Sequence, residues 1–498
     1  MNAIEDIISL MNTDDSKAFT SYLRKKNRRG DTHNIRLFKL IETDDINAIK
    51  NLYKEKNNDD AYHALRKRLQ DSLVEFMANR TFEKNTGEAN EALRLLVVSR
   101  FFLEHHLTKT AFKCLSKAEA KALPLEQFSL LNEIYHTRLQ YAHLNPPENL
   151  DELIEKHNGN AKLMQQEAQL NIAYALLRRE LGEIQLLGKV IDFRAFIEKT
   201  MDSLGVSLDE VLTYKSLYQI LFIANEYATM NHNFNLVEPF VKKSFGFIEG
   251  RKDRAEGQLY YHIYILYFLA NINFRNHRFA ESEEYLAQML EQMQKQGSRY
   301  YDRFFLRHQL LLSLNKHFNG DPGGAIYLAE KTLKGASPKA NPVDVNDLRV
   351  CLAMYCVQLS DRASLTHMAQ FTHTDAWYEK KLGMLWAIRK SLLEILMYAQ
   401  FDGYEELALA RIKSFKRRYK KYLAEVNEQR VWGYALMVER YLLKPETAQH
   451  PDFKKNILAL INPDIKEDIF IISFLGWLLA KADKKSAYQA AIDLINDL

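Results

Sequence analysis

Three tyrosines in one helix-like segment are the side chains best suited to recognition chemistry. Tyr260, Tyr264 and Tyr267 recur at intervals of four and three residues, which places them on one face of an α-helix. Asn271 and Arg275 follow one turn apart, and an amide beside a guanidinium can hold a carboxylate or a peptide backbone. Tyrosine and arginine are common where proteins bind partners, but aromatic stripes also pack in cores. Two interpretations therefore stay open: a recognition surface or a packed interior.

A basic cluster near the amino terminus is a second candidate for binding. No acidic residue occurs between Lys17 and Arg29, and a local excess of positive charge is what phosphate neutralisation needs. Phe19 and Tyr22 lie beside the cluster at helical spacing, so we expect them to pack inward. A solvated surface, a nucleic-acid contact and a contact with an acidic protein are all open for its basic side chains, which include Lys25, Lys26, Arg28 and Arg29.

A second basic cluster occupies residues 411–421. Apolar residues recur through it at helical spacing, which predicts a buried stripe of Ile412, Phe415, Tyr419 and Leu423. The charges would cover the rest of the helix, with their aliphatic stems lying along the neighbouring surface. A solvated outer face and the binding of an anionic polymer or acidic partner are both open for its basic residues, which include Lys416, Arg417 and Lys420.

No recognised catalytic or cofactor-binding motif occurs in the sequence. The chain lacks the phosphate loop G-x-x-x-x-G-K-[ST], a G-x-G-x-x-G after a strand, H-E-x-x-H and G-x-S-x-G. His367, His373 and Asp375 are close in sequence across an expected turn. A metal site needs several ligands converging at about 2 Å, so we interpret these three as turn and capping residues. The sequence therefore predicts no enzyme activity, no cofactor and no metal.

Composition predicts a folded protein of the cytoplasm. Hydrophobic residues make up 47% and charged residues 27% of the chain, which argues against disorder. The net charge of +4 is too small to require a nucleic-acid partner. The three cysteines form no C-x-x-C pair, and we expect buried free thiols in a reducing compartment. No basic secretion signal is evident, and the longest apolar run, Ile469 to Ala480, is too short for a bilayer, so it predicts a buried helix and no membrane partner.

Small or apolar residues inside helix-like segments recur about every 42 residues. That interval fits one helical hairpin per unit, made of two helices of roughly 15 to 18 residues and two short turns. Stacked hairpins bury their apolar faces on one another, so a long chain can fold without one large globular core. The recurrence runs through Ala111, Leu153, Ala195, Val237, Ser282, Ala325, Leu365 and Leu407.

Helix start and stop signals favour an all-α chain. Glycine and proline number only 18 and 10, and most prolines fall where a helix should begin or end. Asp192 and the capping-box pattern of residues 207–210 each precede a helix-like segment. Tight turns at residues 319–324 and 402–403 do the same. No run of alternating apolar and polar residues bounded by hairpin turns stands out, so we expect no β-sheet.

The clearest unit, residues 258–293, resembles the tetratricopeptide repeat. That family has a large and a small residue together in the first helix, then an apolar residue opening the second helix, a small residue and a further apolar residue. These positions are held here by Leu269, Ala270, Phe279, Ser282 and Leu286. Asn273 stands where the family usually has tyrosine, and the closing proline is missing.

The resemblance implies an architecture for the whole chain. Residues 93–120 and 309–333 match more loosely, and the family period of 34 residues is shorter than the spacing here, so the helices should be longer. The resemblance implies an all-α, right-handed α-solenoid of about ten stacked helical hairpins. We expect the repeats to cover residues 91–425, between helical capping regions at residues 1–90 and 426–498.

The resemblance also implies a binding role. The first helix of each such repeat lines the concave surface, and the residues placed there are Tyr264, Tyr267, Asn271, Arg275 and Arg307. The predicted function is a non-catalytic scaffold or adaptor that holds a peptide or protein on this surface. The alternative is a nucleic-acid-binding helical repeat protein that uses the basic clusters at residues 17–29 and 411–421. The sequence indicates no oligomeric state.

Overall fold

Helices make up all the regular structure in the described residues. The computed structural model describes residues 3–9, 11, 13–26, 32–43, 59–84, 87–145, 149–187, 192–205, 213–230, 234–237, 243–244, 246–248, 250–251, 257–337, 340–426, 429–461 and 468–497. These residues form α-helices and short 3₁₀ helices and no strand, which confirms the all-α class. The chain divides into two compact units, residues 1–157 and 158–498. The division falls within the long helix α9 (Leu150–Leu187), and the predicted boundaries of the capping regions stay predictions.

The first unit opens with a small core of its own. Four helices contact one another there: α1 (Ala3–Ser9), α2 (Thr13–Lys26), α3 (Thr32–Glu42) and α5 (Asp59–Lys84). The ring centroid of Phe19 lies 4.9 Å from that of Phe38 and 5.1 Å from that of Phe76. Phe19 is fully buried and Tyr22 is half-buried, as their helical spacing beside the basic cluster predicted.

A helical hairpin and a third helix follow in the first unit. They are α6 (Glu88–Glu104), α7 (Thr108–Ala122) and α8 (Phe128–Gln140), followed by the 3₁₀ helix η1 (Ala142–Leu144). Glu119 of α7 forms an ion pair with Arg138 of α8 and accepts a hydrogen bond from the Tyr135 hydroxyl at 3.2 Å. These polar contacts join α7 to α8.

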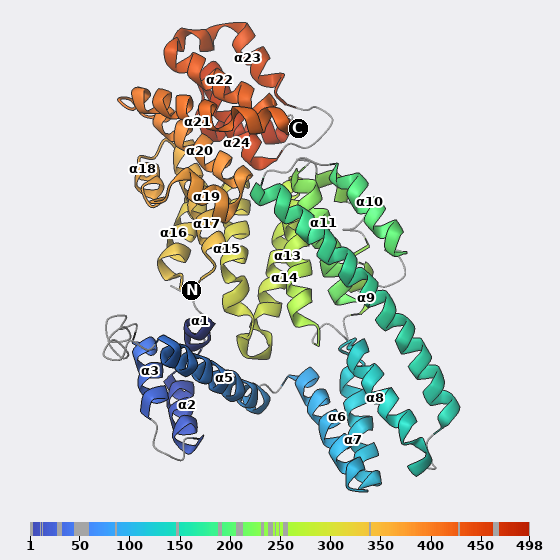
Figure 1. The fold of residues 1–498 in the computed structure, drawn as a ribbon. Helices are drawn as coiled ribbons and strands as arrows, with labels where there is room; N and C mark the ends of the chain where they lie inside the picture. Colours follow the sequence, from blue (N-terminus) through green and yellow to red (C-terminus); the bar gives the residue numbers. More distant parts are fainter. Residues whose placement is uncertain are drawn as a thin grey trace. The chain divides into compact units, whose positions relative to one another are not determined.

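Successive helices of the second unit pack as hairpins (Figure 1). After α9 its elements are α10 (Phe193–Leu204), α11 (Tyr214–Met230), η2 (Phe234–Val237), α13 (Leu259–Arg275), α14 (Phe279–Ser298), α15 (Tyr301–Phe318), α16 (Pro322–Gly335), α17 (Pro342–Gln358), α18 (Ala363–Met368), α19 (Asp375–Leu382), α20 (Met384–Gln400), α21 (Glu405–Glu425), α22 (Gln429–Leu443), η4 (Pro445–Gln449), α23 (Pro451–Leu458), α24 (Ile469–Asp483) and α25 (Ala487–Asp497). Paired neighbours include α13 with α14, α15 with α16, α17 with α18, α20 with α21 and α24 with α25. The helices α11, α13, α15, α17, α20 and α22 also contact one another in that order.

Paired small residues allow close contact within three hairpins. Each pair is separated by twelve residues and is fully buried: Ser99 with Ala111, Ala270 with Ser282, and Ser313 with Ala325. The Ser282 hydroxyl of α14 donates to the Ala270 carbonyl oxygen of α13 at 2.8 Å. Because the distance between packed helices depends on the side chains at their contact, small residues bring the two backbones together.

The eight residues of the predicted recurrence all lie in helices, but two of them, Ala195 and Leu407, are exposed. Leu407 is 51% exposed, whereas the adjacent Ala408 is fully buried. Ala195 is exposed on α10. The connections between helices differ in length from unit to unit, so the buried positions do not keep a constant interval along the chain.

A capping residue begins α10 as the sequence predicted, and a second one, which the sequence analysis did not predict, begins α16 within the predicted turn. The Asp192 carboxylate accepts from the Ala195 backbone N–H at 3.0 Å, at the start of α10. Asp321 accepts from the Gly324 N–H at 2.8 Å, at the start of α16. Each carboxylate satisfies a donor that the first turn of a helix leaves unpaired. The capping box predicted at residues 207–210 lies outside the described residues.

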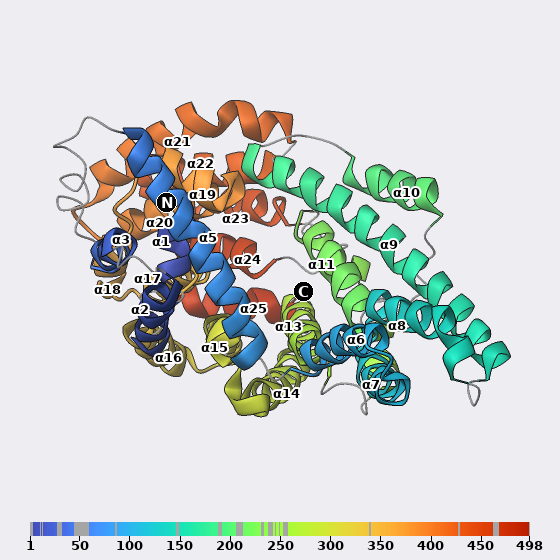
Figure 2. The same cartoon turned by 60° about the horizontal axis from the view of Figure 1, so that its bottom comes forward.

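The last two helices pack against the middle of the array. Both α24 and α25 contact α17, and α24 also contacts α22 (Figure 2). Trp477 of α24 is fully buried, and its indole N–H donates to the Gln400 Oε1 of α20 at 2.7 Å. The Tyr488 hydroxyl donates to the His317 carbonyl oxygen at 2.7 Å. The apolar run in α24 is therefore a buried helix, as predicted, and it shares one core with the hairpins before it.

Buried histidines should make the second unit less stable in mild acid. Burial lowers the pKa of His262 and of His317 to about 4. Unfolded histidine takes up a proton near pH 6.5, so the unfolded state binds more protons as the pH falls from 6.5 to 4, and stability falls with it. Each histidine contributes about 1.4 kcal/mol per pH unit in that window. We expect His317→Gln to reduce the slope of unfolding free energy against pH by that amount, measured by urea unfolding; an unchanged slope would contradict this.

Candidate functional site

Helix α13 has one buried face and one partly exposed face. Ile263, Leu266 and Leu269 are buried at helical spacing in the core of the second unit. Tyr260 and Tyr264 are half-buried and pack against that core. The tyrosine stripe therefore combines both interpretations of its sequence, because its rings pack on the core while part of each side chain stays accessible.

Two tyrosine–arginine pairs join α13 to α15. The Arg303 Nη2 donates to the Tyr260 hydroxyl at 2.8 Å, and its guanidinium carbon lies 4.8 Å from the ring centroid. One turn further along, the Arg307 Nη1 donates to the Tyr264 hydroxyl at 2.9 Å. The Arg307 Nε also pairs with the Asp344 Oδ1 of α17 at 3.0 Å. The structure thus brings together Tyr264 and Arg307, two of the five predicted contact residues.

Further aromatic rings extend these pairs toward α9 and α11. The Tyr218 ring of α11 lies 5.0 Å from that of Tyr264 and 6.4 Å from that of Tyr174 on α9. The Arg178 guanidinium carbon lies 4.2 Å from the centroid of the Phe222 ring. We call the group the tyrosine–arginine surface; all its members are half-buried or exposed, and they are Tyr174, Arg178, Tyr218, Tyr260, Tyr264, Tyr300, Arg303 and Arg307.

The tyrosine–arginine surface carries neutral hydroxyls and uncompensated positive charge. Burial raises the pKa of Tyr260 to about 12 and also raises that of Tyr174, so both phenols stay protonated at neutral pH. Arg178 and Arg303 are exposed, and neither makes an ion pair within the part of the chain that the structure describes. Hydroxyl donors beside guanidinium groups can bind carboxylates and peptide carbonyl oxygens.

Two of the other three predicted contact residues, Asn271 and Arg275, have polar partners inside the unit. The Asn271 Nδ2 donates to the Asn225 Oδ1 of α11 at 2.8 Å. Arg275 forms an ion pair with Asp468, the residue that caps α24. Tyr267 is half-buried, and burial raises its pKa to about 12. Tyr264 and Arg307 therefore contact each other. Asn271 and Arg275 instead connect helices of the same unit.

Tyr174, Tyr218 and Arg303 were not among the predicted contact residues. A signal for Arg303 was present, because it precedes Arg307 by one helical turn just as Tyr260 precedes Tyr264. No comparable signal existed for the two tyrosines, which lie on α9 and α11. Their proximity to α13 depends on how helices pack, and residue spacing within one helix does not report that.

The amino-terminal basic cluster is partly neutralised in the first unit. Lys25 is exposed at the end of α2. Lys26 forms an ion pair with Glu75 of α5 and donates to the Tyr22 hydroxyl at 3.3 Å. The predicted basic residues Arg28 and Arg29 lie outside the described residues.

The second basic cluster lies on α21, and acidic side chains of other helices offset much of its charge. Its predicted apolar stripe, residues 412–423, is confirmed as buried. Three cations pair with carboxylates: Arg411 with Asp375 at 2.7 Å, Lys416 with Glu439 at 2.8 Å, and Arg418 with Glu379. Arg417 and Lys420 are exposed and have no ion pair with any described residue. Positive charge therefore remains on the outer side of the helix.

The residues weighed as a metal site have separate partners. Asp375 opens α19 and binds Arg411 through both carboxylate oxygens, at 2.7 and 2.8 Å. The His373 ring stacks on Trp377 with centroids 4.0 Å apart. His367 lies 3.5 Å from a carboxylate of α16. The residue that caps α19 is Thr374, whose hydroxyl accepts from the Trp377 N–H at 3.3 Å, so the capping role that the sequence predicted for these residues is not confirmed.

Two broader observations bear on function. None of the helices in the described residues combines the length and apolarity needed to cross a bilayer. No protein-family model, curated protein or solved structure matches the chain.

Proposed function

We propose that this protein is a non-catalytic scaffold or adaptor that binds a peptide or protein segment on the tyrosine–arginine surface. The observation that carries the proposal is the series of half-exposed tyrosine rings with interleaved arginines on α9, α11, α13 and α15. Tyrosine offers a large contact area with few rotatable bonds, and arginine adds directed hydrogen bonds. The same residue types dominate the energetics of measured protein interfaces.

The finer architecture belongs to the same proposal. We infer a right-handed solenoid of about ten hairpins, related to the tetratricopeptide repeat, whose first helices line a concave surface. The small-residue pairs twelve positions apart and the contacts between successive first helices support this. The free thiols of Cys351 and Cys356 are buried, which favours a reducing compartment such as the cytoplasm.

The charge of the surface favours an acidic partner segment. Arg178 and Arg303 present guanidinium groups without a carboxylate partner in the described residues, and both lie over aromatic rings. A partner carboxylate could accept bidentate hydrogen bonds from either group. Aromatic faces beside them would cover the aliphatic part of the partner side chain. We therefore expect acidic residues in the segment that binds.

Tyr260→Ala combined with Arg303→Gln should weaken partner binding about tenfold or more, which corresponds to about 1.4 kcal/mol. The double variant removes a ring and a charge from the centre of the surface. Partners captured from native lysate are identified by quantitative mass spectrometry, and the dissociation constant of the purified partner is then measured.

The matched control for this double variant is Tyr327→Ala with Lys331→Gln. Tyr327 of α16 is 66% exposed, and the Lys331 ammonium lies 5.9 Å from its ring centroid, so the control removes a similar pair outside the surface. Both variants should keep the helical circular dichroism of the parent protein. Equal partner affinity in the two variants would contradict the proposed site.

Nucleic-acid binding is the second candidate function, and the exposed cations Arg417 and Lys420 on α21 favour it. Binding through phosphates weakens steeply as salt concentration rises, because counterions are released. Fluorescence anisotropy with 20-nucleotide RNA and DNA tests this at low and moderate salt. Salt-sensitive binding that is lost on Arg417→Gln with Lys420→Gln would support it. No binding to either polymer at low salt would remove it.

A further inference from the structure

An apolar cavity lies among α9, α10, α11 and η2 of the second unit. Its volume is about 390 Å³, which falls within the range of about 300–1,000 Å³ that is common for small-molecule sites. Leu177 of α9, Ile197 of α10 and Ile223 of α11 line it and belong to one hydrophobic cluster. The cavity therefore offers a ligand apolar contacts from three helices at once.

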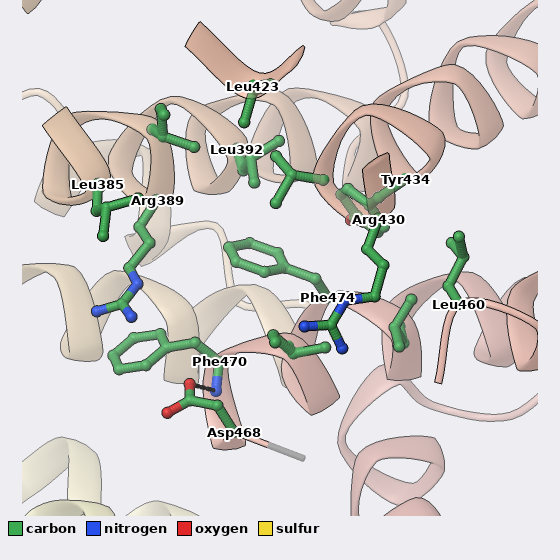
Figure 3. A pocket seen from close by; sticks show the side chains of 14 residues that line it. Leu385, Arg389, Leu392, Leu423, Arg430, Tyr434, Leu460, Asp468, Phe470 and Phe474 are labelled. Carbon is green, nitrogen blue, oxygen red and sulfur yellow. Dashed lines mark hydrogen bonds between the residues drawn. The ribbon is translucent and has the colours of Figure 1, made fainter. Parts of the chain in front are cut away.

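Size separates this cavity from another one among α20, α21, α22 and α24 (Figure 3). That second cavity has a volume of about 80 Å³, and Arg389, Asp468 and Phe470 are among the residues that line it. An apolar cavity of about 150 Å³ holds one benzene ring, so about 80 Å³ is too small for a ring. In the same proportion, about 390 Å³ accommodates a ligand of about ten to fifteen non-hydrogen atoms.

One buried side chain in the wall of the larger cavity has an unused hydrogen-bond acceptor. Gln219 of α11 is 6% exposed and lines the cavity. Its Nε2 donates to the Asn171 Oδ1 of α9 at 3.0 Å, whereas its Oε1 accepts no hydrogen bond from any described residue. Leaving a buried amide oxygen without a donor costs free energy. A hydroxyl or N–H group of a ligand in the cavity would satisfy this oxygen.

The charged residues that line the larger cavity compensate each other. Arg194 and Glu198 belong to α10, and the Arg194 Nε lies 3.0 Å from the Glu198 Oε1. Solvent reaches this ion pair, because the two side chains are 74% and 63% exposed. Burying an unpaired charge among apolar side chains is costly, and this lining offers no uncompensated partner for one. The lining therefore favours a neutral ligand.

We propose that the larger cavity binds a neutral, mostly apolar molecule that carries one hydrogen-bond donor, such as a hydroxylated bicyclic ring. The hydroxyl donates to the Gln219 Oε1, and the rings contact Leu177, Ile197 and Ile223. This inference goes beyond the proposed function, because binding needs no peptide partner. Tyr174 belongs both to the cavity wall and to the tyrosine–arginine surface, whereas Gln219 belongs to the cavity wall alone.

Titration of the full-length protein with 2-naphthol tests the proposal. This neutral probe has one hydroxyl and about eleven non-hydrogen atoms, so it fits the cavity. Its fluorescence, excited at wavelengths that tryptophan does not absorb, should change with saturation at one molecule per chain. 2-Methoxynaphthalene, which lacks the donor, should bind about fivefold more weakly, and the charged 2-naphthoate at least tenfold more weakly. No saturable binding at millimolar concentration, or equal affinity for 2-naphthol and 2-naphthoate, overturns the proposal.

Gln219→Met tests the hydrogen bond to the ligand. Methionine is similar in length to glutamine but lacks the amide oxygen, so 2-naphthol should lose about fivefold in affinity while 2-methoxynaphthalene keeps its affinity. Gln309→Met is the matched control, because Gln309 of α15 is half-buried and is not among the described residues that line the cavity. Equal affinity of 2-naphthol for the two variants overturns the role of Gln219.

Ala173→Phe tests the location of the site, since Ala173 of α9 lines the cavity and a phenyl ring would fill part of it. Binding of 2-naphthol should fall at least tenfold, whereas Ala175→Phe, at an exposed position of the same helix, should leave it unchanged. An equal effect of the two substitutions overturns the location, and if Ala173→Phe does not fold, the comparison of Gln219→Met with Gln309→Met still decides. Neither outcome bears on the proposed function, because a chain that does not bind 2-naphthol can still capture a peptide on the tyrosine–arginine surface.

Discussion

Asp468→Ala should lower the free energy of unfolding of the second unit by about 3–5 kcal/mol. The Asp468 side chain is 3% exposed and that of its partner Arg275 is 14% exposed. Removing one member of a buried pair leaves the other charge without compensation, which costs an amount in this range. The substitution also removes the cap of α24, worth about 1 kcal/mol. Urea unfolding followed by tryptophan fluorescence reports on this unit, because all four tryptophans lie beyond residue 158.

Three further variants separate the charge from the cap at this position. Asp468→Asn keeps an acceptor for the Phe470 N–H but removes the charge, so it should retain most of the destabilisation. Adding Arg275→Met to it removes the uncompensated cation and should restore part of the lost stability. Asp452→Ala is the control, since Asp452 is exposed near the start of α23 and should change stability little. A loss at Asp468 no larger than that at Asp452 would contradict the buried pair.

Gly476→Ala should destabilise the second unit by about 1–3 kcal/mol. This loss is expected even though alanine is about 1 kcal/mol more favourable than glycine inside a helix. A Cβ at position 476 would lie 2.9 Å from the Ala491 Cα and 3.0 Å from the Ala491 nitrogen. These are backbone atoms of α25, so the clash can be relieved only if one helix moves away from the other. The clash therefore outweighs the gain in helix propensity, and urea unfolding should show a lower midpoint.

Gly182→Ala provides the matched control on α9, in the same unit. A Cβ at Gly182 would meet no atom within 4 Å, apart from its own helix and chain neighbours. Helix propensity then acts alone, and we expect a gain in stability of about 0.5–1 kcal/mol. The two glycine-to-alanine substitutions should thus have opposite signs. Stabilisation by both would show that α24 and α25 do not pack at Gly476.

Local signals were sufficient to predict much of the helical structure. Asp192 caps α10 as predicted, because a carboxylate satisfies the first backbone donors wherever the helix lies in the fold. The buried stripe on α21 followed from periodicity, since 3.6 residues per turn fix which side chains share a face. Properties decided within one or two turns of helix are therefore readable from sequence.

Packing between distant helices could not be predicted in the same way. Arg275 and Asp468 are 193 residues apart, and neither has a neighbour in sequence that indicates the other. The packing of α24 and α25 against α17 depends on the complementarity of whole helix surfaces, and such complementarity produces no periodic pattern in the sequence. For the same reason the sequence placed Arg275 on a binding surface, whereas the structure pairs it with Asp468.

The candidate surface was predictable in its centre and not at its margins. Tyr264 and Arg307 were chosen through the repeat geometry, and they form a hydrogen bond. Tyr218 and Arg178 join them through contacts between α9, α11 and α13, which no motif marks.

Position-specific photo-cross-linking shows whether a partner lies on the tyrosine–arginine surface. A benzoylphenylalanine replaces Tyr260 within the tyrosine–arginine surface or Tyr327, an exposed tyrosine of α16 outside it. Irradiation of each protein with its purified partner, followed by mass spectrometry, identifies which position lies at the contact. We expect covalent capture of the partner from position 260 and none from position 327. A partner that co-purifies with both proteins but cross-links from neither position, or from position 327 alone, would contradict it.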